Sequence, residues 1–514
     1  MPTTTSARQP GADRIPSGLV AIRDRDFGYE QARHLLWRAG FGGTPQQIQA
    51  LASWGPEKSV NFLIGVEDID FDGAPLEMFD EAIMRPPTEA ERRAYREARN
   101  RGDEDAVARF RLEQQRRQRD DRRQVREMQK WWLTRMIESP RPLEEKMVLF
   151  WHGHFATSYR KIENSWHMYA QNEMFRSNAM GNFGEMLSLI IRDPAMLAYL
   201  DNQRSRKGRP NENLARELME LFSLGEGNYS ENDIKEGARA LTGYTFNDNE
   251  FVFEANNHDD GGKRILGVRG NLDGDGFVRA ILAQKAASEF MIAKLYRYFV
   301  GDLPSEYQDI DPQTRTYLRK LASMFRESNY DLRPVLKWMF LSEHFYHQSL
   351  CNQQIKSPVQ LVVGAIRSLH TPVRDLSILL DALDLMGQNL LFPPSVKGWD
   401  GGRSWINTST LFVRQNIMNF LLTGKKPVGY DALASEEKYD PTFLLAPLEN
   451  AAPGAERDPD KVIEYLLRFT IGTSPMHARS TLREFVGSVG GEIRPDVVTG
   501  ILLLISAMPE YQLT

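Results

Sequence analysis

Cysteine and long apolar segments are nearly absent from this chain of 514 residues. Its one cysteine, Cys351, excludes a disulfide framework within the chain. No run of apolar residues approaches the length of a membrane-spanning helix. The first twenty residues lack the apolar segment of a secretory signal. We therefore expect the chain as written to be cytoplasmic, unless a partner carries it through export.

Neither sign of charge dominates, because 64 lysines and arginines stand against 69 aspartates and glutamates, a formal net charge of −5. This slight acidity argues against general nucleic-acid binding. The sequence also lacks a parallel strand–helix alternation, a phosphate-binding loop, and the GxSxG and HExxH motifs. Apolar residues recur instead at helical spacing. This pattern predicts a mainly α fold, a multi-helix assembly with long ordered loops.

The chain is longer than a single core of ordinary size requires, so we expect a large domain with subdomains. Shifts in composition divide it into four parts. These are a disordered tail over residues 1–25, a main helical domain over 26–425, an irregular linker over 426–456, and a C-terminal helical segment over 457–514 that packs on the main domain.

Residues 86–130 form an insertion dense in arginine and glutamate, with few large apolar residues. Strong helix formers and alternating charge predict a protruding charged helical arm, either one long helix or two helices broken near Gly102. Six arginines between residues 116 and 126 could contact nucleic acid. Because Asp120, Asp121 and Glu127 lie among them, a solvated arm is the favoured interpretation.

The segment Asn211–Leu224 predicts an amphipathic helix with one strongly polar face. This face is either solvated and tied together by Arg216 between Glu212 and Glu220, or it lines an internal polar site. In the second case the candidate catalytic residues are Glu212, Arg216, Glu217 and Glu220, and the candidate substrate-binding residues are Asn211 and Asn213. Ser230 and Asp233 downstream predict the capped start of a second helix that completes a helical hairpin.

The sequence His152-Gly153-His154 follows an apolar helix that begins at Pro142. In extended backbone both imidazoles would project from one face and could bind a divalent metal, with Asp201 as a further ligand. On a continuous helix the two rings would diverge by about 200°. His152 would then cap the helix end and His154 would bond within the core, which is the favoured interpretation.

A second polar motif lies on a loop over residues 392–407, fixed by Pro393-Pro394 and by three glycines. It carries Lys397, Trp399, Asp400, Arg403, Trp405 and Asn407. Tryptophans beside cations and amides suit contact with a sugar or a peptide, so Lys397, Trp399, Trp405 and Asn407 are candidate substrate-binding residues. The alternative is that the tryptophans fill the core and the polar groups bind backbone.

The chain resembles the bacterial family called domain of unknown function 1800, and the charged arm resembles that of planctomycete-type members. The matching motifs cover about residues 29–425 and read HLLWRAGFGGTPQQI, EEKMVLFWHGHFATS, NENLARELMELFSLGEGNYSENDIKEGARALTGYTF, HDDGGKRILG and PPSVKGWDGGRSWINTSTLFVRQN. The resemblance implies a mostly helical fold without an assigned reaction. It also implies a neighbouring sulfatase-like protein of the family domain of unknown function 1501, whose members commonly carry export signals.

Two classes of function follow from these motifs. The first is a hydrolase-like enzyme that acts on a glycan or a modified polymer through a site lined by histidine, carboxylates and tryptophan, with or without a divalent metal. The second is a non-catalytic partner of the sulfatase-like protein, with the arm as its contact surface. The two classes differ in whether the three polar motifs meet at one cavity.

Overall fold

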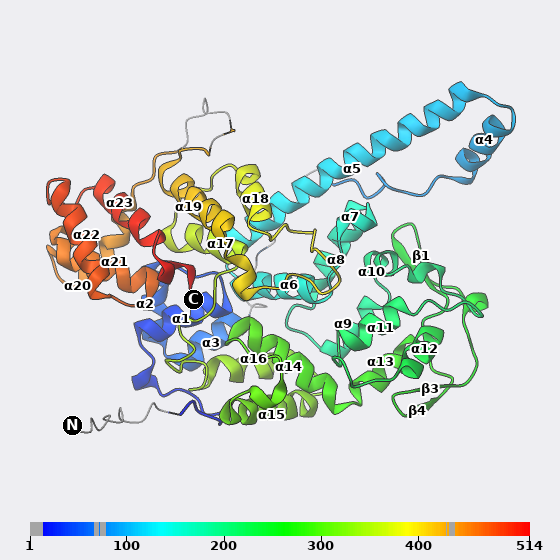
Figure 1. Ribbon diagram of the computed structural model, residues 1–514, viewed down its shortest axis with the longest axis horizontal. Coiled ribbons are helices and arrows are strands. Elements are labelled where there is room, and N and C mark those ends of the chain that lie inside the picture. The colour runs from blue at the N-terminus through cyan, green and yellow to red at the C-terminus, as the bar shows by residue number, and fades with distance from the viewer. Residues whose placement is uncertain (1–13, 66–70, 72–78, 428, 431–436) are drawn as a thin grey trace, which may run out of the picture.

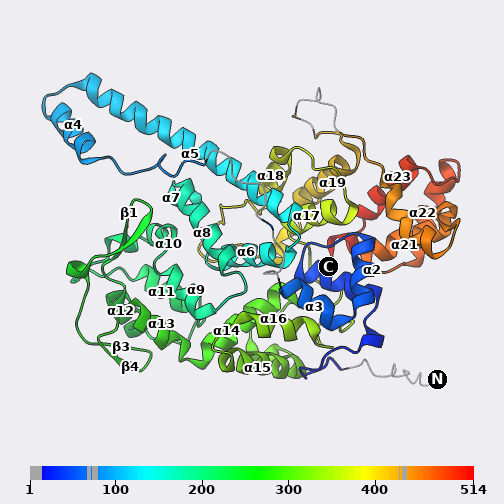
Figure 2. The same ribbon diagram turned by 180° about the vertical axis from the view of Figure 1, so that it is seen from behind.

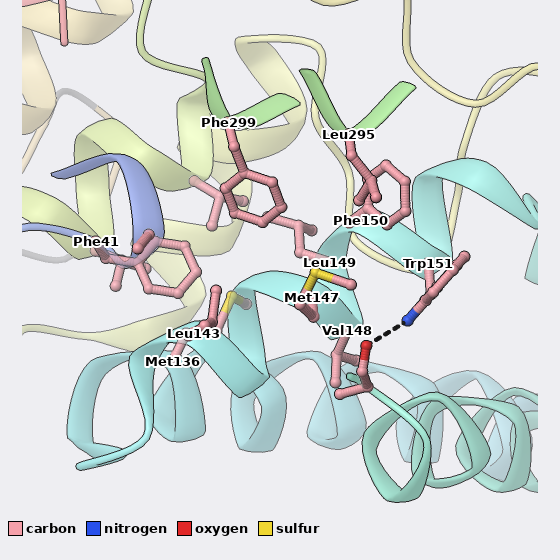
Figure 3. Packing of buried hydrophobic residues seen from close by; sticks show 14 of the residues in the cluster. Phe41, Met136, Leu143, Met147, Val148, Leu149, Phe150, Trp151, Leu295 and Phe299 are labelled. Atoms are coloured by element: carbon pink, nitrogen blue, oxygen red, sulfur yellow. Dashed lines mark hydrogen bonds between the residues drawn. The ribbon is translucent and has the colours of Figure 1, made fainter. Parts of the chain in front are cut away.

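Helix α6 (Pro142–His154) lies at the centre of the molecule (Figure 1). The computed structural model describes residues 14–65, 71, 79–427, 429–430 and 437–514. Every residue of α6 except Gly153 is buried. Phe150 and Trp151 point into the core that surrounds it, and the Trp151 indole donates a 2.9 Å hydrogen bond to the Ala179 carbonyl (Figure 3). A helix that is buried all round must be central, so the other elements assemble around α6.

The predicted mainly α fold is confirmed, since 62% of the structure is helical and 5% is strand. Four helices precede or flank α6 at the N-terminal side: α1 (Tyr29–Ala39), α2 (Pro45–Trp54), α3 (Pro56–Ile64) and α5 (Glu104–Glu138). The lobe beyond α6 holds α7 (Tyr159–Ile162), α8 (Ser165–Ser177), α9 (Phe183–Ile190), α10 (Pro194–Tyr199), α11 (Asn213–Glu220), α12 (Glu231–Ala240) and α13 (Gly274–Leu282).

This lobe also contains two antiparallel hairpins. They are β1 (Tyr244–Asn247) with β2 (Glu250–Phe253), and β3 (Lys263–Ile265) with β4 (Val268–Gly270). The chain then returns through α14 (Lys285–Phe299), α15 (Pro312–Glu327) and α16 (Leu332–Leu341) to α17 (Pro358–Leu369), α18 (Leu376–Leu385) and α19 (Thr408–Thr423). The last helices are α20 (Ala446–Ala451), α21 (Pro459–Ile471), α22 (Met476–Ser488) and α23 (Pro495–Ser506). They gather at the opposite end of the molecule from the hairpins (Figure 2).

The predicted helix starts rest on the side chains that the sequence places there. The Thr44 hydroxyl accepts from the backbone N–H of Gln47, and the side-chain oxygen of Gln47 accepts from the Thr44 N–H. This capping box begins α2. Ser230 and Asp233 do the same at the start of α12. The predicted capped start at Ser230 is confirmed, and it fixes where the helical hairpin α11–α12 turns.

Buried cations cap the carboxyl ends of helices elsewhere in the fold. Arg38 is 1% exposed and donates to the carbonyls of Phe299 and Val300 at the end of α14. The Lys146 ammonium donates to the carbonyls of Trp37 and Gly40 at the end of α1. The last carbonyls of a helix have no hydrogen-bond partner within it and form the negative end of its dipole. A buried cation donates hydrogen bonds to these carbonyls and also neutralises the partial negative charge.

The arm is a pair of antiparallel helices, α4 (Glu89–Asn100) and the first half of α5, which projects from the body (Figure 1). The predicted break is confirmed at Gly102, whose φ of 68° ends α4 before α5 begins. Tyr95 and Phe110 meet edge to face at 5.6 Å and join the two helices. The second half of α5 turns apolar and enters the core through Trp132, so the arm is rooted beside α6.

The two ends of the described chain are tied to the body. The Ile22 N–H donates to the Leu341 carbonyl at 2.8 Å, within the stretch expected to be tail. In the C-terminal segment, helix α23 packs against α19, and the backbone of Thr514 pairs with that of Gln354. None of the helices in the described ranges combines the length and the apolar composition needed to cross a bilayer.

Candidate functional site

Two of the three predicted polar motifs meet at one cavity of about 330 Å³. His154 at the end of α6, Lys294 on α14, and Lys397, Trp399 and Trp405 on the loop before α19 line it, and we call it the tryptophan–lysine cavity. Its remaining polar lining comes from Arg297, Tyr298, Asp302, Gln354, Ser357, Gln360, Gln388 and Asp400. Aromatic walls with a few converging polar groups are typical of ligand sites.

A contact between two glycines holds the loop of residues 392–407, which we call the tryptophan loop, against α6. Gly398 has a φ of 79°, and a Cβ there would collide with the carbonyl oxygen of Gly153. On the other side, a Cβ on Gly153 would lie 3.7 Å from Trp399, so the indole lies directly over the glycine. Only a residue without a side chain allows the backbone to approach this closely. The motifs His152-Gly153-His154 and Lys397-Gly398-Trp399 therefore each supply one of the two glycines of this contact.

The start of the loop is fastened by α5, α6 and α7. The Gln129 side chain donates to the Leu390 carbonyl at 2.7 Å. The Leu391 N–H donates to Nε2 of His152 at 3.2 Å, and its carbonyl accepts from the Tyr159 N–H at 3.0 Å. These bonds hold the loop before Trp399 enters the cavity wall, so the site is largely preformed.

The two histidines of the motif hold their protons on different nitrogens. Nε2 of His152 accepts from an N–H, so its proton is on Nδ1. Nε2 of His154 faces the Phe222 carbonyl at 2.9 Å, which can only accept, so its proton is on Nε2. Burial lowers the pKa of both to about 3, and both are neutral near pH 7. Nδ1 of His154 is thus a buried lone pair, and no group in the described structure donates to it.

The structure does not bring the three predicted metal ligands together. Helix α6 runs through His154, which turns the two rings about 200° apart. Asp201 pairs with Lys161 at 2.8 Å instead. Among the residues that the structure describes, no group of three or more histidines, cysteines, aspartates or glutamates could hold a metal ion. The favoured interpretation holds for His154, which bonds to the Phe222 carbonyl in the core. It is wrong for His152, which accepts from the Leu391 N–H and does not cap the end of α6.

The cavity has an excess of positive charge on the wall formed by α14 and the loop. Lys294 is half-buried, and its pKa is lowered by burial first and then by the charges of Arg297 and Lys397. Its ammonium lies 5.3 Å from the ring of Phe290. Within the described residues neither Lys294 nor Lys397 has a carboxylate within 4 Å. Two carboxylates line the same cavity, Asp302 just after α14 and Asp400 on the loop, and both are exposed.

Within the described structure, no residue of the third motif, the polar face of α11, lines this cavity, and Glu217 is linked to it only through its interaction with the lining residue Lys397. Glu217 is half-buried, and its pKa is raised by burial first and then by the charge of Glu220. Lys397 is close enough to oppose this shift in the pKa of Glu217. The Glu220 carboxylate accepts from the Tyr229 hydroxyl at 2.7 Å. A protonatable carboxyl beside a second carboxylate is an arrangement that general acid–base catalysis uses.

The predicted bridge from Arg216 to Glu220 is wrong. Arg216 forms two bonds of 2.9 and 3.1 Å to Glu231 on α12 and one of 3.4 Å to Glu212. Its side chain is 35% exposed and that of Glu231 is 70% exposed. Exposed pairs of this kind contribute only about 0.2–1 kcal/mol each. Arg216 and Glu231 therefore join α11 to α12 at the surface, and neither Arg216 nor Glu212 lines the cavity.

Two predicted binding residues, Asn211 and Asn407, serve the backbone instead, and a third, Asn213, takes part through its own backbone N–H. The Asn211 amide donates to the Asp201 carbonyl at 3.0 Å, and its oxygen accepts from the Asn213 N–H at 3.0 Å. Asn213 is exposed in the first turn of α11. Asn407 is the N-cap of α19 and accepts from the Thr410 N–H at 2.9 Å. These contacts shape the turns on either side of the site, as an asparagine at a helix start commonly does.

Lys294, Arg297 and Gln360 were missed by sequence reasoning. Their segments, α14 and α17, show the apolar spacing of core helices, and nothing local marks one lysine as facing a cavity. The only signal is that Lys294 interrupts an otherwise apolar stretch between Met291 and Leu295. Long-range packing of α14 against the tryptophan loop assigns it to the site.

A family model described as "Protein of unknown function (DUF1800)" matches residues 34–513. The match spans both motifs of the cavity, the polar face of α11 and the charged arm. Neither the curated proteins nor the solved structures contain a match to this chain.

Proposed function

We propose that this chain, which belongs to the DUF1800 family, binds a sugar unit of a larger polymer in the tryptophan–lysine cavity and hydrolyses a bond beside it. The strongest support is a single cavity that Trp399, Trp405, Lys397 and His154 line together. Indole faces bury the apolar faces of sugar rings, while amides and a neutral imidazole bind their hydroxyls.

The polar lining suits a ligand with many hydroxyl groups. Gln354, Gln360 and Gln388 supply amides that both donate and accept. Nδ1 of His154 supplies an acceptor that lacks a partner among the described residues. Because this nitrogen is itself buried, a ligand hydroxyl reaches it only if the cavity lining shifts, and the bond then satisfies an atom whose unpaired burial costs about 1–3 kcal/mol.

The proposed reaction uses the two carboxyl groups of α11. Glu217, in its protonated form, gives its proton to the leaving oxygen as the bond from that oxygen to the anomeric carbon breaks. A water molecule attacks the same carbon, and Glu220 takes the proton that the water loses. One water is consumed, and the polymer gains one new reducing end. The raised pKa of Glu217 and its interaction with Lys397 support the first role.

Replacing Glu217 by glutamine should abolish hydrolysis while ligand binding persists. A glutamine keeps the shape and cannot give up a proton, so the rate of reducing-end release should fall by about 10²–10⁴-fold. The assay follows reducing ends from a panel of neutral and acidic polysaccharides, and binding is followed by quenching of tryptophan fluorescence. Glu226→Gln, an exposed glutamate on the loop after α11, is the matched control.

The companion variant is Trp399→Ala, which should weaken binding of every polysaccharide that the parent binds, by about 10-fold or more. If no member of the panel quenches the parent's fluorescence, the binding proposal is contradicted. If binding occurs and the parent and Glu217→Gln proteins release reducing ends equally, the hydrolytic step is contradicted and the chain is a binding protein.

A second candidate function, as the partner of a sulfatase-like protein of the DUF1501 type, is favoured by a groove on the arm. It has a volume of about 890 Å³ and lies between α4, α5 and the segment that leads into α4. Its charged lining consists of Arg85, Arg92, Arg109, Arg111, Arg117, Glu91 and Glu113. Glu91 is bound by Arg85 at 2.8 Å and Glu113 lies 3.5 Å from Arg117, which leaves a positive excess. Tyr95 and Phe110 supply an apolar floor. The groove suits an acidic segment with an apolar anchor.

Reversing two arginines of the groove should abolish assembly with such a partner. Arg109→Glu combined with Arg111→Glu places negative charge against the acidic segment, and complex formation in size-exclusion chromatography should be lost. The control combines Arg160→Glu with Arg479→Glu, two exposed arginines outside the arm. Equal assembly by both double variants would remove the groove from consideration, and absence of a complex with the parent would contradict the second candidate function.

A further inference from the structure

Three cations from two separate parts of the chain line one side of the tryptophan–lysine cavity. Lys294 and Arg297 lie three residues apart on α14, which places them on the same helix face. Lys397 comes from the tryptophan loop about one hundred residues later. Trp399 lies beside them in the same lining and over Gly153. The cations thus meet next to the surface on which a sugar ring would stack.

The protein compensates these charges only in part, through Asp302 acting on Arg297 and Glu217 lying near Lys397. Arg297 donates only to the Pro304 carbonyl, at 3.3 Å, among the contacts of its guanidinium in the described residues. The hydroxyl of the neighbouring Tyr298 donates to the Lys146 carbonyl, so its proton is not available to a bound anion. Lys294 is half-buried, and the like charges of Arg297 and Lys397 repel its ammonium. Like charges held together in a partly desolvated wall favour the binding of an anion.

We propose that the sugar unit in the cavity carries an anionic group, a carboxylate or a sulfate ester, which Lys294 and Lys397 bind. This inference rests on the proposed function, because it assigns the charge of the ligand that the tryptophans hold. Ammonium groups bind oxyanions as point charges, and the partial burial of Lys294 makes the interaction stronger than at an open surface. Asp302 and Asp400 line the same cavity and are exposed, as Lys397 is, so the half-buried Lys294 is the cation at which an anion is most strongly bound.

The test compares ligands that differ only in charge. One pair is an oligogalacturonate and its methyl ester, and the other is a sulfated galactan oligosaccharide and its desulfated form. Affinities are measured by tryptophan fluorescence at low and at physiological salt. The parent should bind the charged member of at least one pair about 10-fold more tightly than the neutral member at low salt, and added salt should reduce the ratio. The pair that shows the preference identifies the anionic group.

The variants Lys294→Met and Lys397→Met should each bring that ratio to within about threefold, because the anionic group of the charged member loses its partner. Lys320→Met, an exposed lysine on α15, is the matched control and should keep the parent's ratio. If Lys294→Met lowers the melting temperature and leaves the ratio unchanged, the lysine has only a structural role and the inference is overturned.

The two proposals fail in different ways. Equal binding of the charged and neutral members by the parent overturns the anionic preference and leaves the proposed sugar site standing. Failure of the parent to bind any of the four ligands, together with failure across the wider polysaccharide panel, overturns both.

Discussion

Replacing Arg38 by methionine is expected to lower the free energy of unfolding by about 3–5 kcal/mol, enough to leave much of the protein unfolded at 37 °C. The guanidinium is 1% exposed and donates to the Phe299 carbonyl at 2.9 Å, to the Val300 carbonyl, and to Thr514 at 3.3 Å. Methionine fills a similar volume and donates nothing. Three buried acceptors would lose their partner, and each costs about 1–3 kcal/mol when left unsatisfied.

Chemical denaturation of the parent and the variant measures this effect. Arg279→Met on α13, the same change at an exposed helical position, should alter the free energy of unfolding by less than about 0.5 kcal/mol. Similar denaturation midpoints for Arg38→Met and Arg279→Met would show that water replaces the guanidinium at the end of α14, and would contradict the importance of buried cations as helix caps in this fold.

Acid is expected to destabilise the protein strongly below pH 6.5, through histidines that the fold holds neutral. Burial lowers the pKa of His152 and His154 to about 3, from an ordinary 6.5. The unfolded chain therefore takes up their protons first as the pH falls. Their contribution is fully present above pH 6.5 and is lost toward pH 3, at about 1.4 kcal/mol per pH unit for each histidine. For the two together this amounts to about 5 kcal/mol between pH 6.5 and 4.5.

Other groups titrate in this range, and burial raises the pKa of Asp193 to about 7, which acts in the opposite direction. A comparison of variants removes their contribution. The difference in unfolding free energy between the parent and His154→Phe should shift by about 2–3 kcal/mol in favour of the variant between pH 7 and pH 4.5. His477→Phe, at an exposed position on α22, should show no such shift. A difference that stays constant with pH for His154→Phe would mean that His154 is protonated within the fold.

Local features of the structure could be predicted from the sequence where a residue acts on its own neighbours. The capping boxes at Thr44 and Ser230, the break at Gly102 and the helical hairpin α11–α12 all follow from side chains within a few residues of the feature. The favoured core role of His154 also followed, because Pro142 begins an apolar helix long enough to include both histidines. The role of His152 did not, because its partner is the distant Leu391 N–H.

The two β-hairpins were missed for a physical reason. The turn between β1 and β2 uses Asp248 at a φ of 56°, and the turn between β3 and β4 uses Leu266 at 48° before Gly267 at 87°. In a sequence, hairpin turns with positive φ are normally recognised by an asparagine or aspartate followed by glycine. Leucine there is uncommon. It is tolerated because the Leu266 N–H donates to the Asp233 carboxylate on α12, a long-range contact that no local pattern contains.

The site was predicted in part for the same reason. The tryptophan loop and the histidine motif each had recognisable chemistry, and their convergence depends on the contact between Gly398 and Gly153. The residues Arg216, Asn211 and Asn407 looked alike as candidates because polar side chains at helix starts serve both ligands and caps. The one local signal of Lys294 is its place in an otherwise apolar stretch, which does not indicate a cavity, and the packing of α14 against the loop gives it its place there.

Hydrogen–deuterium exchange with and without bound ligand tests the central claim most directly, that the tryptophan–lysine cavity is the binding site. The parent protein is measured alone and with the polysaccharide that gives the largest fluorescence change. We expect slower exchange in residues 397–405 and at the carboxyl end of α6, with the arm helices α4 and α5 unchanged. Unchanged exchange in residues 397–405, with protection elsewhere or confined to the arm, would contradict the claim.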